Sequence, residues 1–81
     1  MNTTTKKAEH ATKFSDGTPI TSYLATGYAE GFEEASDEDQ LLAWGYLIAT
    51  GLCWSLRGWF GRTASSLIEN GVISKSGKVL V

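Results

Sequence analysis

Few residues of this chain could perform covalent chemistry, and their types do not form a catalytic set. Cys53 is the only cysteine and His10 the only histidine among the 81 residues. A cysteine or serine nucleophile needs a base beside it, and His10 lies in a polar stretch that we expect to be a tail. The surroundings of Cys53, Gly-Leu-Cys-Trp-Ser-Leu, are apolar and indicate a buried structural thiol. We therefore expect a protein without catalytic residues or enzymatic activity.

The chain also lacks the residues that would bind a metal or a cofactor. One cysteine and one histidine cannot supply the ligand cluster of a transition-metal site. The acidic run at residues 30–39 lacks the alternating spacing and central glycine of a calcium loop. We expect no metal and no cofactor, and we interpret the run as a solvated helix junction. Its functional alternative is a patch that imitates a phosphate backbone or docks on a basic protein, with the contact residues Glu33, Glu34, Asp37 and Glu38.

A pair of glycines in Leu-Arg-Gly-Trp-Phe-Gly-Arg-Thr-Ala-Ser-Ser-Leu-Ile-Glu-Asn-Gly, residues 56–71, raises the question of a phosphate-binding loop. A KH domain clamps backbone nucleotides with a G-x-x-G loop between two helices. Gly58 and Gly61 have this spacing, between two segments that we expect to be helical. The middle residues should be small or basic to let a phosphate approach, and Trp59 and Phe60 are neither. A KH-like site is therefore only an alternative interpretation.

A winged helix-turn-helix is a second alternative, because a helix ending near Asn70 is followed by a segment with the pattern of a hairpin wing. Its recognition helix should present several basic or amide side chains to the major groove. This helix offers Arg62 but also Glu69, which phosphates would repel. The third interpretation is structural: Gly58 and Gly61 let two short helices meet at a close angle, with aromatic side chains around the corner. We favour this interpretation for the glycines.

Charge and aromatic content favour a protein partner over nucleic acid. The net charge of −2 divides into +1 over residues 1–29, −6 over residues 30–39 and +3 over residues 40–81. The densest charge cluster is acidic, whereas a nucleic-acid binder normally carries a dominant basic patch. The chain also holds three tryptophans, three tyrosines and three phenylalanines, and exposed aromatic side chains anchor many protein interfaces. At the helix corner, the residues expected to contact a partner are Arg57, Trp59 and Arg62.

The elements that must position these residues follow a polar N-terminal stretch. Residues 1–15 are rich in threonine and lysine, with Phe14 as their only large apolar residue, which predicts a flexible polar tail. A single small domain would occupy residues 16–81. The N-terminus lacks the apolar core of a secretory signal, and no apolar run reaches the roughly 18 residues of a membrane span. We expect a cytoplasmic protein that does not contact membranes.

The first and last of the expected helices lie on either side of a central one. Thr18 followed by Pro19 predicts an N-cap and a first helical position, and the helix would continue through residues 25–35. The last helix, residues 59–70, is amphipathic and ends at Gly71. The following Val-Ile-Ser-Lys-Ser-Gly-Lys-Val-Leu-Val predicts two short strands around a turn. The expected fold is mainly α, a small helical domain of about three helices with a short C-terminal β-hairpin.

The central helix is expected at residues 37–50. Ser36 followed by Asp39 approximates a capping box, and acidic residues in the first turn complement the helix dipole. Apolar side chains cover most of the helix circumference. That pattern indicates either an enclosed helix or one shared with a partner, and it motivates the expectation of a homo-oligomer.

Residues 43–73 resemble a family of very short bacteriophage proteins. The shared pattern is close to A-W-x-x-L-I-x-T-G-L-x-W-x-L-x-G-W-F-G-R-T-A-x-x-L-I-x-x-G. The positions that match are Ala43, Trp44, Leu47, Ile48, Thr50, Gly51, Leu52, Trp54, Leu56, Gly58, Trp59, Phe60, Gly61, Arg62, Thr63, Ala64, Leu67, Ile68 and Gly71. Arg57 stands where we expect a glutamine in relatives. The resemblance implies a phage origin and assigns no reaction.

These observations together lead to one hypothesis and one alternative. The hypothesis is a small, non-enzymatic, phage-type module that binds and modulates a host or defence protein in the host-cell cytoplasm. Small phage proteins commonly act by binding host factors, so a host or phage protein is the expected partner by analogy. The alternative is a winged helix-turn-helix-like or KH-like regulator that binds nucleic acid.

Overall fold

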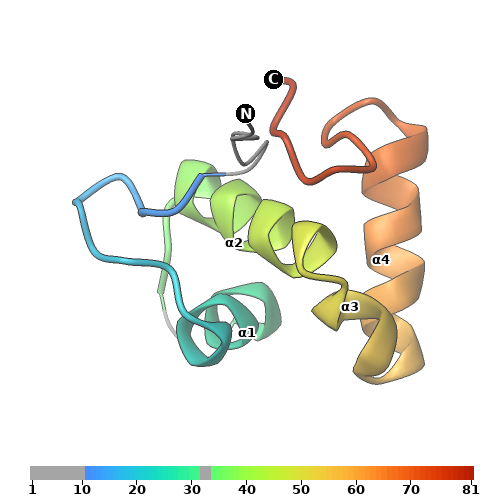
Figure 1. Ribbon diagram of the computed structural model, residues 1–81, viewed down its shortest axis with the longest axis horizontal. Coiled ribbons are helices and arrows are strands. Elements are labelled where there is room, and N and C mark those ends of the chain that lie inside the picture. Colours follow the sequence, from blue (N-terminus) through green and yellow to red (C-terminus); the bar gives the residue numbers. More distant parts are fainter. Residues whose placement is uncertain (1–10, 32–33) are drawn as a thin grey trace, which may run out of the picture.

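The protein is described by a computed structural model that covers residues 11–31 and 34–81 (Figure 1). The described residues form four helices: α1 (Ser22–Glu30), α2 (Asp37–Ala49), α3 (Leu52–Ser55) and α4 (Gly58–Glu69). Helix α2 runs through the middle of the molecule, with α1 on one side and α4 on the other. The single turn of α3 joins the end of α2 to the start of α4. The expectation of a mainly helical domain is confirmed.

Helix α2 forms as its sequence predicts. The Ser36 side chain accepts a hydrogen bond from the Asp39 amide at 3.1 Å, and three acidic residues occupy the first turn. One face buries Trp44, Leu47 and Ile48. Half-buried apolar side chains on its other faces also pack against the core. The apolar circumference of α2 is therefore explained by enclosure within one molecule, so this pattern does not itself call for a second copy.

Helix α1 begins later than its sequence suggests. Thr21 is the N-cap, and its hydroxyl accepts a hydrogen bond from the Leu24 amide at 3.2 Å. The predicted N-cap at Thr18 is wrong, because Pro19 instead pairs with Lys13 in an isolated antiparallel bridge. The helix ends at Glu30, so its predicted continuation to residue 35 is wrong. Its C-cap is Gly31, whose φ of 85° lies in the left-handed region that favours glycine.

The N-terminal segment, residues 11–20, packs on the helices. Phe14 is 4% exposed, and its ring centroid lies 4.6 Å from that of Tyr28. The Asp39 carboxylate accepts hydrogen bonds from the Ser15 amide at 2.8 Å and from the Ser15 hydroxyl at 3.0 Å. Residues 14 and 15 therefore belong to the packed domain, although their sequence suggested a tail. The remainder of the expected tail, residues 1–10, lies outside the described residues.

The C-terminal segment, residues 72–81, folds back on itself without forming a β-hairpin. Its backbone makes one isolated antiparallel bridge, between Ile73 and Val79, and the described residues contain no strand. The Lys78 amide donates a hydrogen bond to the Ser74 hydroxyl at 3.0 Å. In a regular β-ladder, this amide would bond to a backbone carbonyl instead of a side chain. The predicted hairpin is wrong.

A close approach of two glycines holds the C-terminal segment against α2. Gly77 is buried with a φ of 95°. Its carbonyl oxygen occupies the space that the Cβ atom of any larger residue at position 45 would need. A Cβ built on Gly45 would be 2.5 Å from that oxygen. This backbone packing places Ile73 in the core with no exposed surface. It also accounts for a compact turn where the sequence predicted two short strands.

Candidate functional site

The candidate site with the clearest geometry lies between the start of α4 and the end of α1. A pocket of about 280 Å³ is lined by Glu30 from the end of α1 and by Arg57, Trp59 and Phe60. We call it the corner pocket. Two of the three residues predicted at this corner, Arg57 and Trp59, line it. Glu30 belongs to the acidic run at residues 30–39 but was not among the predicted contact residues.

The indole of Trp59 is exposed on one side and supported on the other. It is 43% exposed, whereas Phe60 beneath it is 2% exposed. The ring centroids of Trp59 and Phe60 are 4.8 Å apart in an edge-to-face arrangement, and those of Trp59 and Trp44 are 5.8 Å apart. Aromatic pairs at these distances attract one another beyond their buried area. The ring therefore has a defined position while keeping a large apolar surface in solvent.

Two guanidinium groups lie near the start of α4. Arg57 occupies the N-cap position without a side-chain capping bond, and the first turn contains no acidic residue. Arg62, the third predicted corner residue, extends back toward the same end, because a Cβ on Gly58 would lie 3.3 Å from its Nη1 atom. The helix dipole adds a positive partial charge there. The start of α4 therefore favours a carboxylate or another anionic group.

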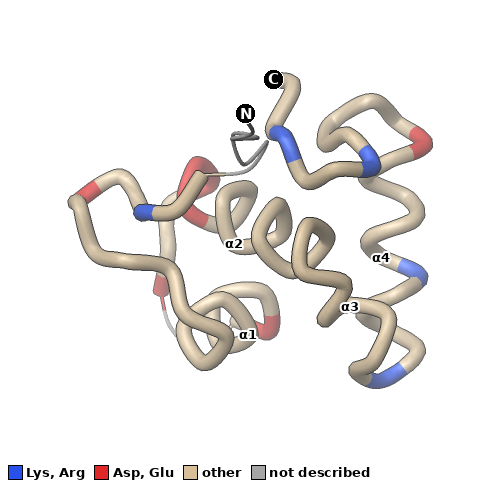
Figure 2. The backbone as a smooth tube through the Cα atoms, viewed as in Figure 1, with Lys and Arg blue, Asp and Glu red and all other residues tan. Residues whose placement is uncertain are grey.

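The predicted acidic patch lies elsewhere. Glu34, Asp37 and Glu38 are exposed residues just before and within the first turn of α2, while Glu33 lies outside the described residues. Figure 2 shows acidic positions around α1 and the start of α2, and basic positions along α4 and the C-terminal segment. The structure therefore does not join the two predicted sets into one site.

The glycines of the G-x-x-G sequence have packing roles. Gly58 and Gly61 both lie in the first turns of α4, so they do not form the loop between helices that a KH domain uses. A Cβ on Gly61 would be 3.6 Å from Cε3 of Trp54, which shows that the Trp54 ring rests against this glycine. The structural interpretation of the pair accounts for this geometry.

Cys53 has the character of a structural thiol. Its side chain has no exposed surface, and burial raises the pKa of the thiol above its ordinary value, partly offset by a hydrogen bond with backbone. A raised pKa keeps the sulfur in the protonated, poorly nucleophilic form. Among the described residues, no three His, Cys, Asp or Glu side chains are grouped so that they could hold a metal ion. Within the same residues, no helix combines the length and apolar character of a membrane span.

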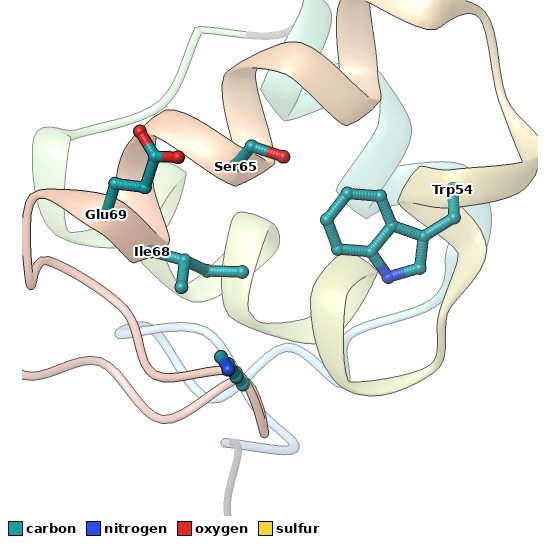
Figure 3. Close-up of a pocket in the computed structure, with 5 residues that line it drawn as sticks. Trp54, Ser65, Ile68 and Glu69 are labelled. Atoms are coloured by element: carbon teal, nitrogen blue, oxygen red, sulfur yellow. The ribbon is translucent and has the colours of Figure 1, made fainter.

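A second pocket, which was not predicted, lies on the other side of α4. Its volume is about 440 Å³, and we call it the Trp54 groove; its lining residues are Trp54, Ser65, Ile68, Glu69 and Lys75. Figure 3 shows the Trp54 indole extending from α3 toward Ser65 and Ile68 of α4. At roughly 100° per residue, Ser65 and Ile68 fall about 180–240° around α4 from Trp59. The two pockets are thus on opposite sides of one helix.

One sequence signal could have indicated this groove. Gly61, Ser65 and Ile68 follow one another at spacings of four and three residues, so they share a line along α4. Two small residues on such a line leave room for a large side chain from a neighbouring element. The identity of that neighbour depends on how α3 turns, which the sequence pattern did not specify.

Comparisons with known proteins give one match. Residues 27–81 match the model of a family described as Domain of unknown function (DUF7417). No curated protein and no solved structure matches the chain. The matched residues include all those that line the corner pocket and the Trp54 groove. They leave out the N-terminal segment that carries Phe14.

Proposed function

We propose that this chain, which belongs to the family described as Domain of unknown function (DUF7417), is a small non-enzymatic module that binds another protein through the corner pocket. The observation that carries the proposal is a 43% exposed tryptophan, Trp59, next to the exposed Arg57 and Arg62. Tryptophan and arginine are the side chains most enriched among residues that dominate binding energy at protein interfaces.

The support beneath Trp59 makes it suited to binding. Contacts with Trp44 and Phe60 fix the ring before a partner arrives. A side chain that is already ordered loses little conformational entropy on association, whereas an immobilised flexible side chain costs about 0.5–1.5 kcal/mol. The corner pocket therefore presents apolar area that a partner can cover at low entropic cost.

The charges around the pocket define the chemistry of the partner. Arg57, Arg62 and the positive end of the α4 dipole favour a carboxylate at the α4 side of the pocket, whereas Glu30 disfavours one at the α1 side. The aromatic wall of the pocket favours an apolar side chain. The best fit is a protein segment with one large apolar residue and an acidic residue on the side that faces Arg57 and Arg62. The phage origin implied by residues 43–73 leads us to propose a host or defence protein as the source of this segment, met in the host cytoplasm.

A nucleic-acid partner is supported less well by the same geometry. The described residues contain no strands that could act as a wing, and the G-x-x-G sequence is helical. Glu69 is exposed on α4, where it would oppose a phosphate backbone. Buried Cys53, with its raised pKa, supports the non-enzymatic part of the proposal.

The proposal is tested by affinity capture from host cells, followed by measurement of binding to the captured protein. Trp59→Ala should weaken that binding by about thirtyfold or more, the scale of an interface hot spot. Arg57→Ala combined with Arg62→Ala should also weaken it. The matched control is Lys13→Ala combined with Lys78→Ala, which removes the same charge from exposed positions outside both pockets and should have little effect.

Two results would contradict the proposal. Equal binding by the Trp59 variant and the wild type, with circular dichroism showing both folded, would exclude the corner pocket as the contact. A gel shift of DNA or RNA at about 50 mM salt that disappears with Arg62→Ala and falls steeply with added salt would favour the nucleic-acid alternative.

A further inference from the structure

The Trp54 groove is a second exposed apolar site that the proposed function does not use. Trp54 is 52% exposed, although one edge of its ring rests on Gly61 of α4. The ring and the half-buried Ile68 form an apolar floor, and Glu69 and Lys75 add charges of opposite sign. Trp54, Ser65, Glu69 and Lys75 are all exposed, so the groove is shallow and fits a protein surface better than an enclosed small molecule.

The charges of the groove indicate what covers it. Glu69 and Lys75 come from different elements, α4 and the C-terminal segment. Within the part of the chain that the structure describes, neither side chain makes an ion pair. A polyanion would meet Glu69, and a strongly basic partner would meet Lys75. A surface with the same two charges, rotated by a half-turn, would place each charge opposite its complement.

We propose that the Trp54 groove is the contact between two copies of this chain related by a two-fold axis. In such a contact, residue i of one copy meets residue j of the other, and j meets i. Glu69 of each copy pairs with Lys75 of the other, and the two indoles cover the apolar floors. The groove is thus self-complementary in both charge and apolar character. The contact uses none of the corner-pocket residues and goes beyond the proposed function.

The experiment measures the association of the full chain by analytical ultracentrifugation over a wide concentration range. The patch is small for a protein interface, so we expect a weak dimer with a Kd on the order of 10–100 µM. Trp54→Ala should raise that Kd by about thirtyfold. Arg57→Ala should leave it unchanged, because Arg57 lies at the corner pocket.

Charge reversal tests the two-fold arrangement and does not depend on removing an aromatic side chain. Glu69→Lys alone places lysine against lysine twice, and Lys75→Glu alone places glutamate against glutamate twice. Each variant should dimerise at least about tenfold more weakly than the wild type. An equimolar mixture of the two should form a heterodimer, because both contacts again join opposite charges.

Three outcomes would overturn the inference. The first is a wild-type chain that stays monomeric at all concentrations up to about 1 mM, well above the expected Kd. The second is a dimer that is unaffected by Trp54→Ala and by both charge reversals, which would place the contact elsewhere. The third is a mixture of the two reversal variants that fails to associate while each is folded by circular dichroism. None of these outcomes bears on binding at the corner pocket, so the two proposals fail separately.

Discussion

Replacing Gly45 with alanine should destabilise the protein, although alanine is the better helix former. In an isolated helix, exchanging glycine for alanine would stabilise by about 1 kcal/mol. In α2, the new Cβ would lie 2.5 Å from the Gly77 carbonyl oxygen. Non-bonded Cβ–oxygen distances in folded proteins are longer than this. Because the obstructing atom belongs to the backbone and cannot rotate away like a side chain, the C-terminal segment must move away from α2.

The size of the effect follows from what that movement exposes. Ile73 is fully buried by the segment, and full exposure of an isoleucine side chain costs about 1.5–3 kcal/mol. Overpacking without such movement costs about 1–3 kcal/mol. Exposure of Ile73, less the gain of about 1 kcal/mol in helix propensity, leaves a net loss, so Gly45→Ala should lower the free energy of unfolding by about 0.5–2 kcal/mol.

Gly61→Ala is the matched control. Gly61 also lies within a helix, but its Cβ would be 3.6 Å from the Trp54 ring, an ordinary van der Waals distance. Helix propensity should therefore prevail, and Gly61→Ala should stabilise by about 0.5–1 kcal/mol. Urea unfolding followed by circular dichroism measures both variants. Stabilisation by Gly45→Ala equal to that by Gly61→Ala would refute the close approach of Gly45 and Gly77.

Three further predictions address the N-terminal segment, the start of α2 and the thiol. Phe14→Ala should lower the free energy of unfolding by about 3 kcal/mol, because Phe14 is 4% exposed and packs on Tyr28; urea unfolding would instead show less than about 0.5 kcal/mol for a residue in a mobile tail. Ser36→Ala should cost about 1 kcal/mol in the same assay through loss of the bond to the Asp39 amide, and Ser36→Asp should retain most of the stability. Because burial raises the pKa of Cys53, its stabilising contribution is present below the unfolded thiol pKa and is lost as pH rises through the folded pKa. The stability difference between wild type and Cys53→Ala should therefore decrease above about pH 9, and a difference that grows with pH would contradict this environment.

The sequence predicted the elements whose signals are local. The start of α2 depends on Ser36 and on acidic residues within one turn of it, and α4 depends on apolar spacing over twelve residues. Such signals act between near neighbours in the chain, so they survive in almost any tertiary setting. Arg57 and Trp59 line one pocket for the same reason, since they are two positions apart in the sequence, but their role as contact residues stays a prediction.

The errors arose where contacts outside the local pattern decide the structure. Thr18 and Pro19 have the local pattern of a helix start, but the chain there is held extended by the bridge to Lys13 and by burial of Phe14. The predicted C-terminal strands do not form, because Gly77 packs against Gly45, which lies 32 positions away in the sequence. Neither partner could be identified from spacing alone.

The placement of the two pockets on opposite sides of α4 has a consequence for how strongly the protein can bind an oligomeric target. A pair of molecules joined at the Trp54 groove, as proposed, would keep both corner pockets uncovered and would therefore be bivalent. If the target is itself oligomeric, the second engagement becomes intramolecular, and avidity can exceed the single-site affinity by about 10²–10⁴ without any new contact. A weak dimer would then serve as a concentration-dependent amplifier of a modest interaction.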